Sequence, residues 1–206
     1  TSFVKILAGV LSKDMGELSR TVKVSYKPQY IDRESGDLVG SILQTAMQKY
    51  HNQLIVPLEL KHILEKPISQ LSGGELQRVA IAECLARNAD LYLLDEPSAY
   101  LDVEQRLAVS KVIRHLVETK GISVLVVDHD LLFLDYISDK LLVFTGQPAV
   151  AGTAAGPYPM EEGMNSLLSH LHISLRRDEF SHRPRINKLD SYKDREQKST
   201  GKLYYQ

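Results

Sequence analysis

Short runs of apolar residues in the middle of the chain predict buried strands. Residues 91–94 and 122–127 are almost wholly apolar, which is typical of strands covered on both faces of a parallel sheet. Residues 21–26 instead alternate apolar and polar side chains, which predicts a strand with one buried face. A further strand is expected at residues 141–144.

The segments between these strands carry apolar residues at helical spacing. Helices are predicted at residues 1–9, 41–50, 74–86, 102–121 and 131–136. Strand–helix–strand units of this length imply right-handed parallel crossovers and an α/β fold. Beyond residue 146 the pattern changes. Residues 152–159, rich in Gly, Ala and Pro, are expected to form a loop, and residues 167–175 a helix that turns into a strand.

Composition and charge limit the number of domains and the class of partner only a little. The 206 residues suffice for one α/β domain, alone or with an appendage, and the net charge of -1 gives no global case for a nucleic-acid or membrane partner. The single cysteine, Cys84, cannot form an internal disulfide and is expected to be a small core residue. No apolar run reaches membrane-spanning length and no leader pattern opens the sequence, so we expect a cytoplasmic protein.

Residues 72–75, Ser-Gly-Gly-Glu, predict a distinctive helix start. Ser72 and Glu75 have the spacing of a capping box. The two glycines allow close approach of another group, and a helix N-terminus offers free N–H groups to a phosphate. A cap with no ligand is the simpler alternative for these residues alone.

Polar residues follow the two apolar strands. Asp95 and Glu96 come directly after one strand, and His129 follows the other. Ligands of open parallel sheets bind beyond the carboxyl ends of the strands. One carboxylate there can hold Mg2+, and a second can polarise a water for attack on phosphorus. Taken singly, each of these residues could equally be structural.

The combination resembles the nucleotide-binding domain of ATP-binding-cassette (ABC) ATPases. Residues 71–77 match the family's signature motif, 91–96 its Walker B strand, and 98–102 its D-loop, while Gln29 matches the Q-loop glutamine. The resemblance implies ATP and Mg2+ as ligands, with Glu96 and His129 as catalytic residues. It assigns Thr1, Gln29 and Asp95 to the metal, and it places a larger set at the nucleotide: Thr1, Gln29, Ser72, Gly73, Gly74, Glu75, Asp95 and Asp102.

The family's phosphate-binding loop, Gly-x-x-Gly-x-Gly-Lys-Ser/Thr, is matched only at its last residue. Thr1 corresponds to the magnesium-ligating hydroxyl, and residues 3–9 to the helix behind it. The resemblance therefore implies an ABC domain truncated at its amino end, which would bind ATP poorly and be inactive alone.

The D-loop Ser-Ala-Tyr-Leu-Asp and the tail from Arg176 to Gly201 look like the RNase L inhibitor family of twin-cassette ribosome-recycling ATPases. This implies a partial ABC domain at residues 1–150, with a helical subdomain at about 31–75, and a C-terminal hinge segment at 151–206. The stretch looks like the second cassette of that family. Implied partners are the first cassette, the small ribosomal subunit and release-factor-like proteins, with an iron–sulfur cluster expected only outside this chain.

Other functions are weaker matches. A transporter ATPase subunit would dock a membrane partner through residues 31–67, but the tail argues against it. A chromosome-structural or DNA-repair ATPase needs a long coiled coil between Gln29 and Leu71, and no sustained heptads occur there. An interaction fragment without activity is the remaining alternative. The basic tail suits a solvated surface or a contact with ribosomal RNA, although we favour packing within the protein.

Overall fold

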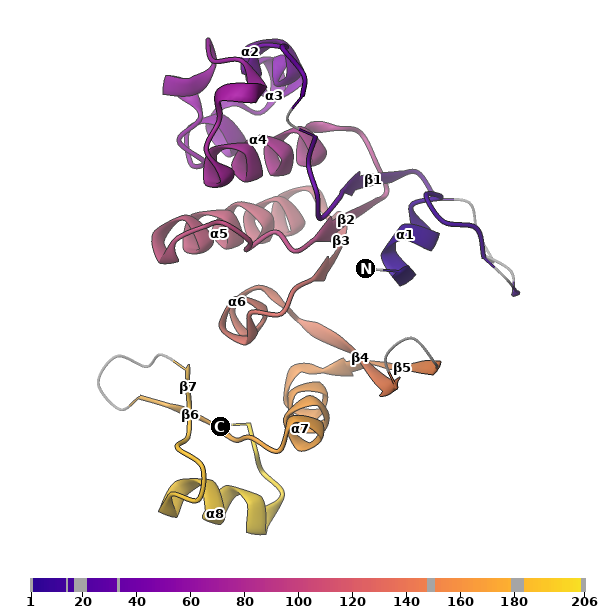
Figure 1. The fold of residues 1–206 in the computed structure, drawn as a ribbon, viewed down its shortest axis with the longest axis vertical. Coiled ribbons are helices and arrows are strands. Elements are labelled where there is room, and N and C mark those ends of the chain that lie inside the picture. Colours follow the sequence, from indigo (N-terminus) through magenta and orange to yellow (C-terminus); the bar gives the residue numbers. More distant parts are fainter. Residues whose placement is uncertain are drawn as a thin grey trace. The chain divides into compact units, whose positions relative to one another are not determined.

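The structure is a computed structural model that describes residues 2–13, 15–16, 22–32, 34–147, 151–178 and 184–204. The chain forms two compact units, Thr1–Ile137 and Ser138–Gln206, coloured along the sequence in Figure 1.

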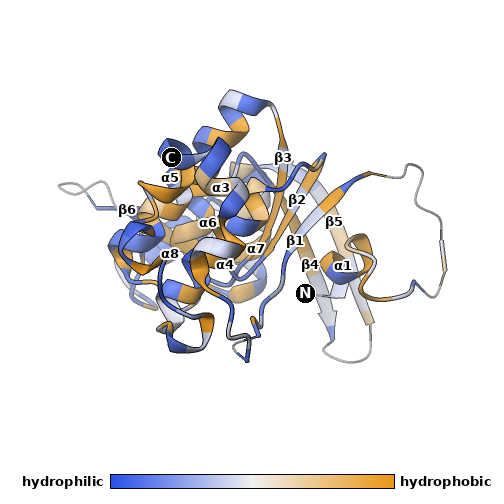
Figure 2. Cartoon of the chain, turned by 90° about the horizontal axis from the view of Figure 1, so that it is seen from above, coloured by the Kyte–Doolittle hydropathy of each residue, from blue (hydrophilic) through white to orange (hydrophobic). Residues whose placement is uncertain are grey.

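The first unit is built around a parallel sheet of three strands. β1 (Val24–Lys27), β2 (Leu91–Asp95) and β3 (Ser123–Val127) lie in the order β1-β2-β3. The central strand β2 pairs in parallel with both neighbours, and its apolar residues are orange in Figure 2. The predicted parallel α/β core is therefore confirmed. β3 is less covered than expected: Ser123 is exposed and residues 124–127 are half-buried.

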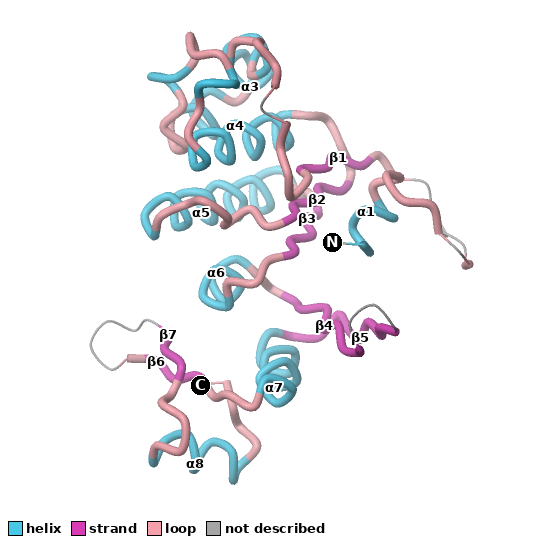
Figure 3. The backbone as a smooth tube through the Cα atoms, in the orientation of Figure 1, coloured by secondary structure: helices cyan, strands magenta, loops and turns pink. Residues whose placement is uncertain are grey.

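Two long helices cover one side of this sheet. α4 (Gly73–Ala86) and α5 (Val103–Lys120) lie together, with α1 (Ser2–Leu7) on the opposite side (Figures 1 and 3). α6 (Leu131–Ile137) packs against α5. Buried residues from α4, β2 and α5 form one core, including Ile81, Leu85, Leu94, Val109 and Ile113. Each side chain removed from water in this way contributes roughly 1.5–3 kcal/mol.

Cys84 lies in this core on α4, as predicted. Its sulfur is 3.3 Å from the hydroxyl of Ser25, and that hydroxyl donates to the Cys84 carbonyl at 2.8 Å. Burial raises the pKa of the thiol to about 11. Cys84 is therefore an inert packing residue.

The single helix predicted at residues 41–50 is wrong in its continuity. The structure has two short helices, α2 (Val39–Ile42) and α3 (Gln44–Lys49), followed by a π-helical turn η1 (His51–Ile55) and two 3₁₀ turns, η2 (Lys61–Ile63) and η3 (Ile68–Gln70). These short pieces change direction often enough to bring distant apolar residues together. The fully buried side chains are Val39, Leu43, Ala46, Leu54, Ile55, Leu58, Leu60 and Ile63.

Within its described residues, the second unit holds two small antiparallel sheets and two helices. β4 (Lys140–Gln147) pairs with β5 (Ala151–Pro159), and β6 (Leu175–Arg177) pairs with β7 (Pro184–Ile186). α7 (Met160–Leu171) packs on the β4–β5 pair, and α8 (Tyr192–Thr200) ends at Gly201 in the left-handed conformation. Leu141, Met164, Leu168, Leu175 and Leu203 are its buried apolar residues of largest size.

Two expectations for this region are wrong. Residues 152–159 form a strand rather than a loop, since their backbone pairs with β4 despite the Gly, Ala and Pro content. The strand predicted at 141–144 does not extend the parallel sheet, because its partner is β5. The compact units thus divide before β4 rather than after residue 150, and the division into cassette and hinge segment stays a prediction.

Candidate functional site

The carboxyl ends of β2 and β3 bring together the residues predicted to carry out chemistry. Asp95 ends β2, Glu96 follows it, and His129 lies two residues after β3. The Nδ1 atom of His129 is 3.8 Å from Oε1 of Glu96. The Glu96 side chain is 26% exposed and that of His129 is 76% exposed. The pair therefore faces a space that solvent or a ligand can reach.

Asp95, the last residue of β2, is fully buried. The hydroxyl of Tyr26 donates to its carboxylate at 3.4 Å. Burial and, second, the Asp95 charge raise the pKa of Tyr26 to about 12. Tyr26 therefore stays a neutral donor, and Asp95 is a carboxylate held from one side by the neighbouring strand.

Lys27 is a buried cation at the end of β1. Its Nζ donates to the carbonyl of Asp95 at 2.8 Å and to that of Glu96 at 3.4 Å. Burial lowers the pKa of Lys27 to about 8, while the nearby carboxylates, Asp95 first, oppose this shift. Lys27 therefore holds the backbone of Asp95 and Glu96 in place from the neighbouring strand β1.

The loops after β2 and β3 are joined through Asp128. Its carboxylate accepts from the Ser98 N–H at 3.0 Å and from the Ser98 hydroxyl at 2.8 Å. It also accepts from the N–H of Asp130 at 2.9 Å, and Arg106 of α5 pairs with Asp130. The segments that carry Glu96 and His129 are therefore held together by hydrogen bonds, independently of any ligand.

The predicted helix start at Ser72 is confirmed in detail. The Ser72 hydroxyl accepts from the Glu75 N–H at 3.3 Å, and the Glu75 carboxylate accepts from the Ser72 N–H at 2.8 Å. Lys66 donates to the same carboxylate at 3.0 Å. The Ser72 N–H, followed by Lys66, lowers the pKa of Glu75 to about 2. Glu75 therefore has a structural role in its own domain, whatever else it contacts.

The two glycines after Ser72 lie against Tyr100 of the D-loop. A Cβ on Gly73 would come within 3.2 Å of the Tyr100 ring, and one on Gly74 within 3.0 Å of the Tyr100 carbonyl oxygen. Tyr100 itself has a left-handed backbone, with φ of +62°. The glycines thus allow two segments of the same chain to approach closely, a reason for them that the sequence did not reveal.

The remaining predicted residues are distributed around this edge of the sheet. Asp102 caps α5 through the N–H of Gln105 at 2.8 Å, in the second capping box of the described residues. Gln29 lies two residues beyond β1, at the same carboxyl edge as Asp95. Thr1 lies outside the described residues.

The donor set at this edge fits a magnesium nucleotide. In the part of the chain that the structure describes, no cluster of three or more His, Cys, Asp or Glu side chains could hold a metal by itself. Mg2+ does not require one, because it binds through one or two carboxylates, waters and phosphate oxygens. A buried Asp95 beside a partly exposed Glu96 supplies that number of carboxylates.

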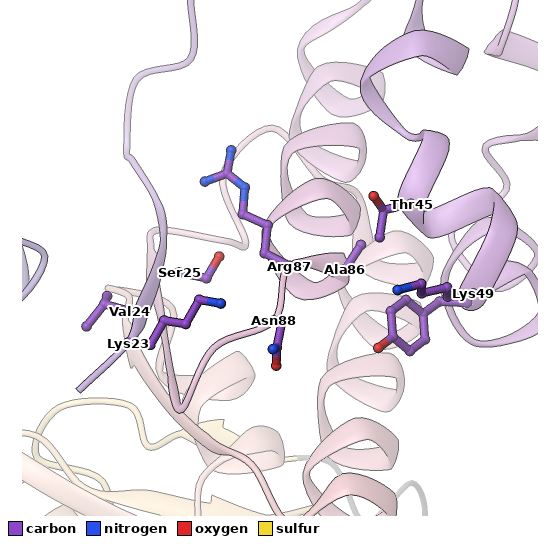
Figure 4. A pocket seen from close by; sticks show the side chains of 9 residues that line it. Lys23, Val24, Ser25, Thr45, Lys49, Ala86, Arg87 and Asn88 are labelled. Carbon is purple, nitrogen blue, oxygen red and sulfur yellow. The ribbon is translucent and has the colours of Figure 1, made fainter.

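A separate hollow of about 490 Å³ lies at the amino end of β1 (Figure 4). Its lining includes Lys23, Lys49, Arg87 and Tyr50. Arg87 pairs with Glu83, and Lys120 stacks on the Tyr50 ring at 3.5 Å. None of the predicted site residues lines it, and the carboxyl edge with Glu96 is at the other end of the strand.

Sequence reasoning missed three residues at the site: Lys27, Gln77 and Tyr100. Gln77 of α4 donates to the Glu96 carbonyl at 2.6 Å. Gln77 and Tyr100 both lie inside matched motifs, the signature at 71–77 and the D-loop at 98–102. For Lys27, the one signal in the sequence was its position directly after the strand predicted at residues 21–26.

No helix in the described ranges is long and apolar enough to cross a membrane.

A family model described as ABC transporter matches residues 1–99. An uncharacterized ABC transporter ATP-binding protein of Methanocaldococcus jannaschii is 51% identical over the whole chain, and the translation initiation factor RLI1 of Saccharomyces cerevisiae is 41% identical. The chain spans 35% of the length of each. ABC transporter E family member 3 of Arabidopsis thaliana is 40% identical, over 57% of this chain and 71% of its own length.

Solved structures agree with these matches. A complex of the archaeal ribosomal stalk protein aP1 with the archaeal ribosome recycling factor aABCE1 matches all of this chain with a TM-score of 0.92 and 49% identity, over 41% of its own chain. A model of ribosome-bound archaeal Pelota and ABCE1 matches with a TM-score of 0.94 and 50% identity, over 36% of that chain. A metal-chelate-type ABC transporter, at 20% identity, shares the fold alone. The matches do not support the expectation that this chain is the second cassette.

Proposed function

Because the chain belongs to the RNase L inhibitor, or E, family of ABC ATPases, we propose that it is one ATP-hydrolysing cassette of a twin-cassette factor that splits ribosomes into subunits. The observation that carries the hydrolytic part is the approach of His129 to Glu96 beside the buried Asp95. Two carboxylates and a histidine at the carboxyl edge of a parallel sheet suit phosphoryl transfer to water.

The roles of the residues follow from their placement. Glu96 orients a water and accepts its proton, and His129 stabilises charge on the terminal phosphate. Asp95, with Gln29 and Thr1, would hold Mg2+, which when bound neutralises charge on the phosphates. Ser72, Gly73, Gly74, Glu75 and Asp102 would face the nucleotide of the other cassette. We also keep the expectation that these 206 residues alone bind ATP weakly, since the phosphate-binding glycines and lysine are not among them.

The ribosomal part of the proposal rests on the relatives. Two matching structures are described with a ribosomal stalk protein or with Pelota on the ribosome. Closing of two cassettes on ATP would supply the motion that separates the subunits, and hydrolysis would reopen them. The small ribosomal subunit, release-factor-like proteins and a cytoplasmic location belong to this proposal, as does an iron–sulfur domain elsewhere in the protein.

The test uses Glu96→Gln in the full-length protein. This change keeps the shape of the side chain and removes the proton acceptor, so ATP should bind and remain unhydrolysed with the cassettes closed. Glu104→Gln, which alters an exposed carboxylate in the first turn of α5, is the matched control. ATP turnover and retained nucleotide are measured. Turnover at the unaltered rate in Glu96→Gln would overturn the assignment.

A second arm tests the ribosomal part alone. Purified joined ribosomes are incubated with full-length protein, a release-factor-like protein and ATP, and subunits are separated on a sucrose gradient. Free subunits should accumulate with ATP and not with ADP. Intact ribosomes despite normal ATP turnover would contradict the ribosomal proposal and leave the hydrolytic one standing.

A further inference from the structure

Glu96 has a backbone conformation that needs support. Its φ is +49°, in the left-handed region that side-chain-bearing residues rarely adopt. Such a conformation persists only where surrounding groups hold it. Its N–H donates to the Val127 carbonyl at 2.7 Å, which attaches it to β3. The Ala99 N–H donates to its carbonyl at 3.3 Å, which closes a turn.

Two buried side chains complete this support. Gln77 Nε2 donates to the Glu96 carbonyl at 2.6 Å, and Lys27 Nζ donates to it at 3.4 Å and to the Asp95 carbonyl at 2.8 Å. Both side chains belong to residues that are 1% exposed. Burying an ammonium or an amide is costly unless it is hydrogen-bonded. Their acceptors are the Asp95 and Glu96 carbonyls, which lie on either side of the Glu96 Cα.

We propose that Gln77 and Lys27 are positioning residues for hydrolysis, which hold the Glu96 backbone so that its carboxylate faces His129. This inference rests on the proposed function, because it assumes that Glu96 acts on the attacking water. Gln77 belongs to helix α4 and Lys27 to strand β1, so hydrogen bonds from two different elements hold the Glu96 backbone in its left-handed conformation. Neither side chain has to contact the nucleotide for this role.

The hydrogen bond from Gln77 to the Glu96 carbonyl also links Glu96 to the start of helix α4. Gln77 lies one helical turn after Gly73, on the helix whose start would meet the phosphate of the other cassette. A displacement of α4 along its axis therefore pulls on the Glu96 carbonyl. Movement of α4 would thereby reach Glu96 through the Gln77 hydrogen bond, which is one of several contacts that hold the Glu96 backbone.

The experiment compares Gln77→Met with Lys27→Met in the full-length protein. Methionine matches glutamine in length and is one atom shorter than lysine, and each substitution removes the N–H donors. A misplaced Glu96 should lower kcat by about 10- to 100-fold, since small displacements of a catalytic group cost that much. The KM for ATP and the affinity for a fluorescent ATP analogue should change less than about twofold, because no phosphate contact is removed. Gln48→Met, an exposed glutamine on α3, is the matched control.

Combination with Glu96→Gln separates positioning from a general structural effect. If Gln77 acts through Glu96, the double variant should turn over ATP no more slowly than Glu96→Gln alone. A folded Gln77→Met protein with unaltered kcat would overturn the inference, as would losses that multiply in the double variant. If Gln77→Met does not fold, the same two criteria apply to Lys27→Met. Normal turnover in Glu96→Gln would instead contradict the proposed function itself.

Discussion

The carbonyl oxygen of Tyr100 lies 3.0 Å from the point where a Cβ of Gly74 would be. The Gln105 side-chain oxygen is 3.2 Å from the same point. The D-loop therefore packs directly on the start of helix α4, and a backbone atom rather than a movable side chain limits the space. Gly73 is different, since its closest neighbours are atoms of the Tyr100 side chain.

Gly73→Ala and Gly74→Ala should consequently respond differently to a change at Tyr100. Both alanines gain helix propensity, by less than the ~1 kcal/mol of a helix interior because the two positions start α4, and this gain offsets part of the crowding. Tyr100→Gly removes the ring and suits the left-handed backbone, so it should restore the ATP turnover of Gly73→Ala. It leaves the carbonyl in place and should not restore Gly74→Ala. ATP turnover of the full-length single and double variants measures this difference.

The unfolding free energy of each variant is the necessary control. Crowding that acts on the D-loop should lower turnover with a stability change within about 1 kcal/mol. If Tyr100→Gly restores both alanine variants equally, the backbone contact at Gly74 does not limit the space, and the interpretation is wrong.

Glu75 should make the stability of the first unit depend on acid pH. Its pKa is lowered from 4.5 to about 2, chiefly by the Ser72 N–H. A carboxylate with a lowered pKa stabilises the folded state above its unfolded pKa, and this contribution is lost as the pH falls from about 4.5 through 2. Denaturant unfolding at pH 7, 4 and 3 should show a loss that Glu75→Gln lacks.

At pH 7, Glu75→Gln should cost less than about 1 kcal/mol, because glutamine can still accept from the Ser72 N–H, as Gln105 does for Asp102, and only the charge that faces Lys66 is lost. The comparison variant is Glu104→Gln, another carboxylate in a first helical turn, whose pH profile should parallel that of the unaltered protein. Identical acid profiles for Glu75→Gln and the unaltered protein would show that the Lys66 and Ser72 contacts do not stabilise the charge.

Asp128 should stabilise the loops around the candidate site. Asp128→Ala leaves the Ser98 N–H and hydroxyl and the Asp130 N–H without their acceptor. Loss of partners for buried donors costs about 1–3 kcal/mol. Because these loops carry Glu96 and His129, ATP turnover should fall more steeply than ATP affinity. Asp128→Asn keeps one acceptor oxygen and should lose less of both stability and turnover. Calorimetry with parallel turnover assays checks the order of the two variants, and an equal loss in both would contradict it.

Local chemistry explains what the sequence predicts well. The capping boxes at Ser72 and Asp102 depend on residues three apart. The box at Ser72 forms as predicted, and a second one at Asp102 starts the helix predicted from that residue. The apolar strand 91–95 needs only its own composition. By contrast, β5 is a strand because of its partner β4, and its Gly, Ala and Pro residues gave no local sign of that pairing.

In the candidate site, too, some features follow from local sequence and others depend on contacts between distant residues. Asp95, Glu96 and His129 follow from their positions after apolar strands, since parallel strands share one edge. The supporting contacts join residues far apart in sequence: Lys27 to Asp95, Gln77 to Glu96, and Tyr100 to Gly73. Sequence spacing carries no information about which side chain reaches a given carbonyl, so these contacts required the structure.

Asp194 should be the main polar support of the second unit. Its carboxylate accepts from the Ser174 hydroxyl at 2.6 Å, the Asp190 N–H at 3.0 Å and Lys198 at 2.8 Å. Lys198 and Ser174 hold the pKa of Asp194 at about 2. Asp194→Ala removes the acceptor for all three donors and should loosen α8 and the segment before β6. Asp178→Ala, which removes the partner of Arg185 on β7, is the control at a more exposed ion pair and should have a smaller effect.

Amide hydrogen exchange in the full-length protein measures this prediction locally. Protection should fall in residues 184–204 of Asp194→Ala, while the amides of α4 and β2 keep their protection, because the two compact units have separate cores. Acid should have the same local effect: the Asp194 contribution is present above about pH 3.8 and is lost as the pH falls toward 2. Equal loss of protection in both units would show that they unfold as one, and that Asp194 stabilises the whole chain rather than its second unit.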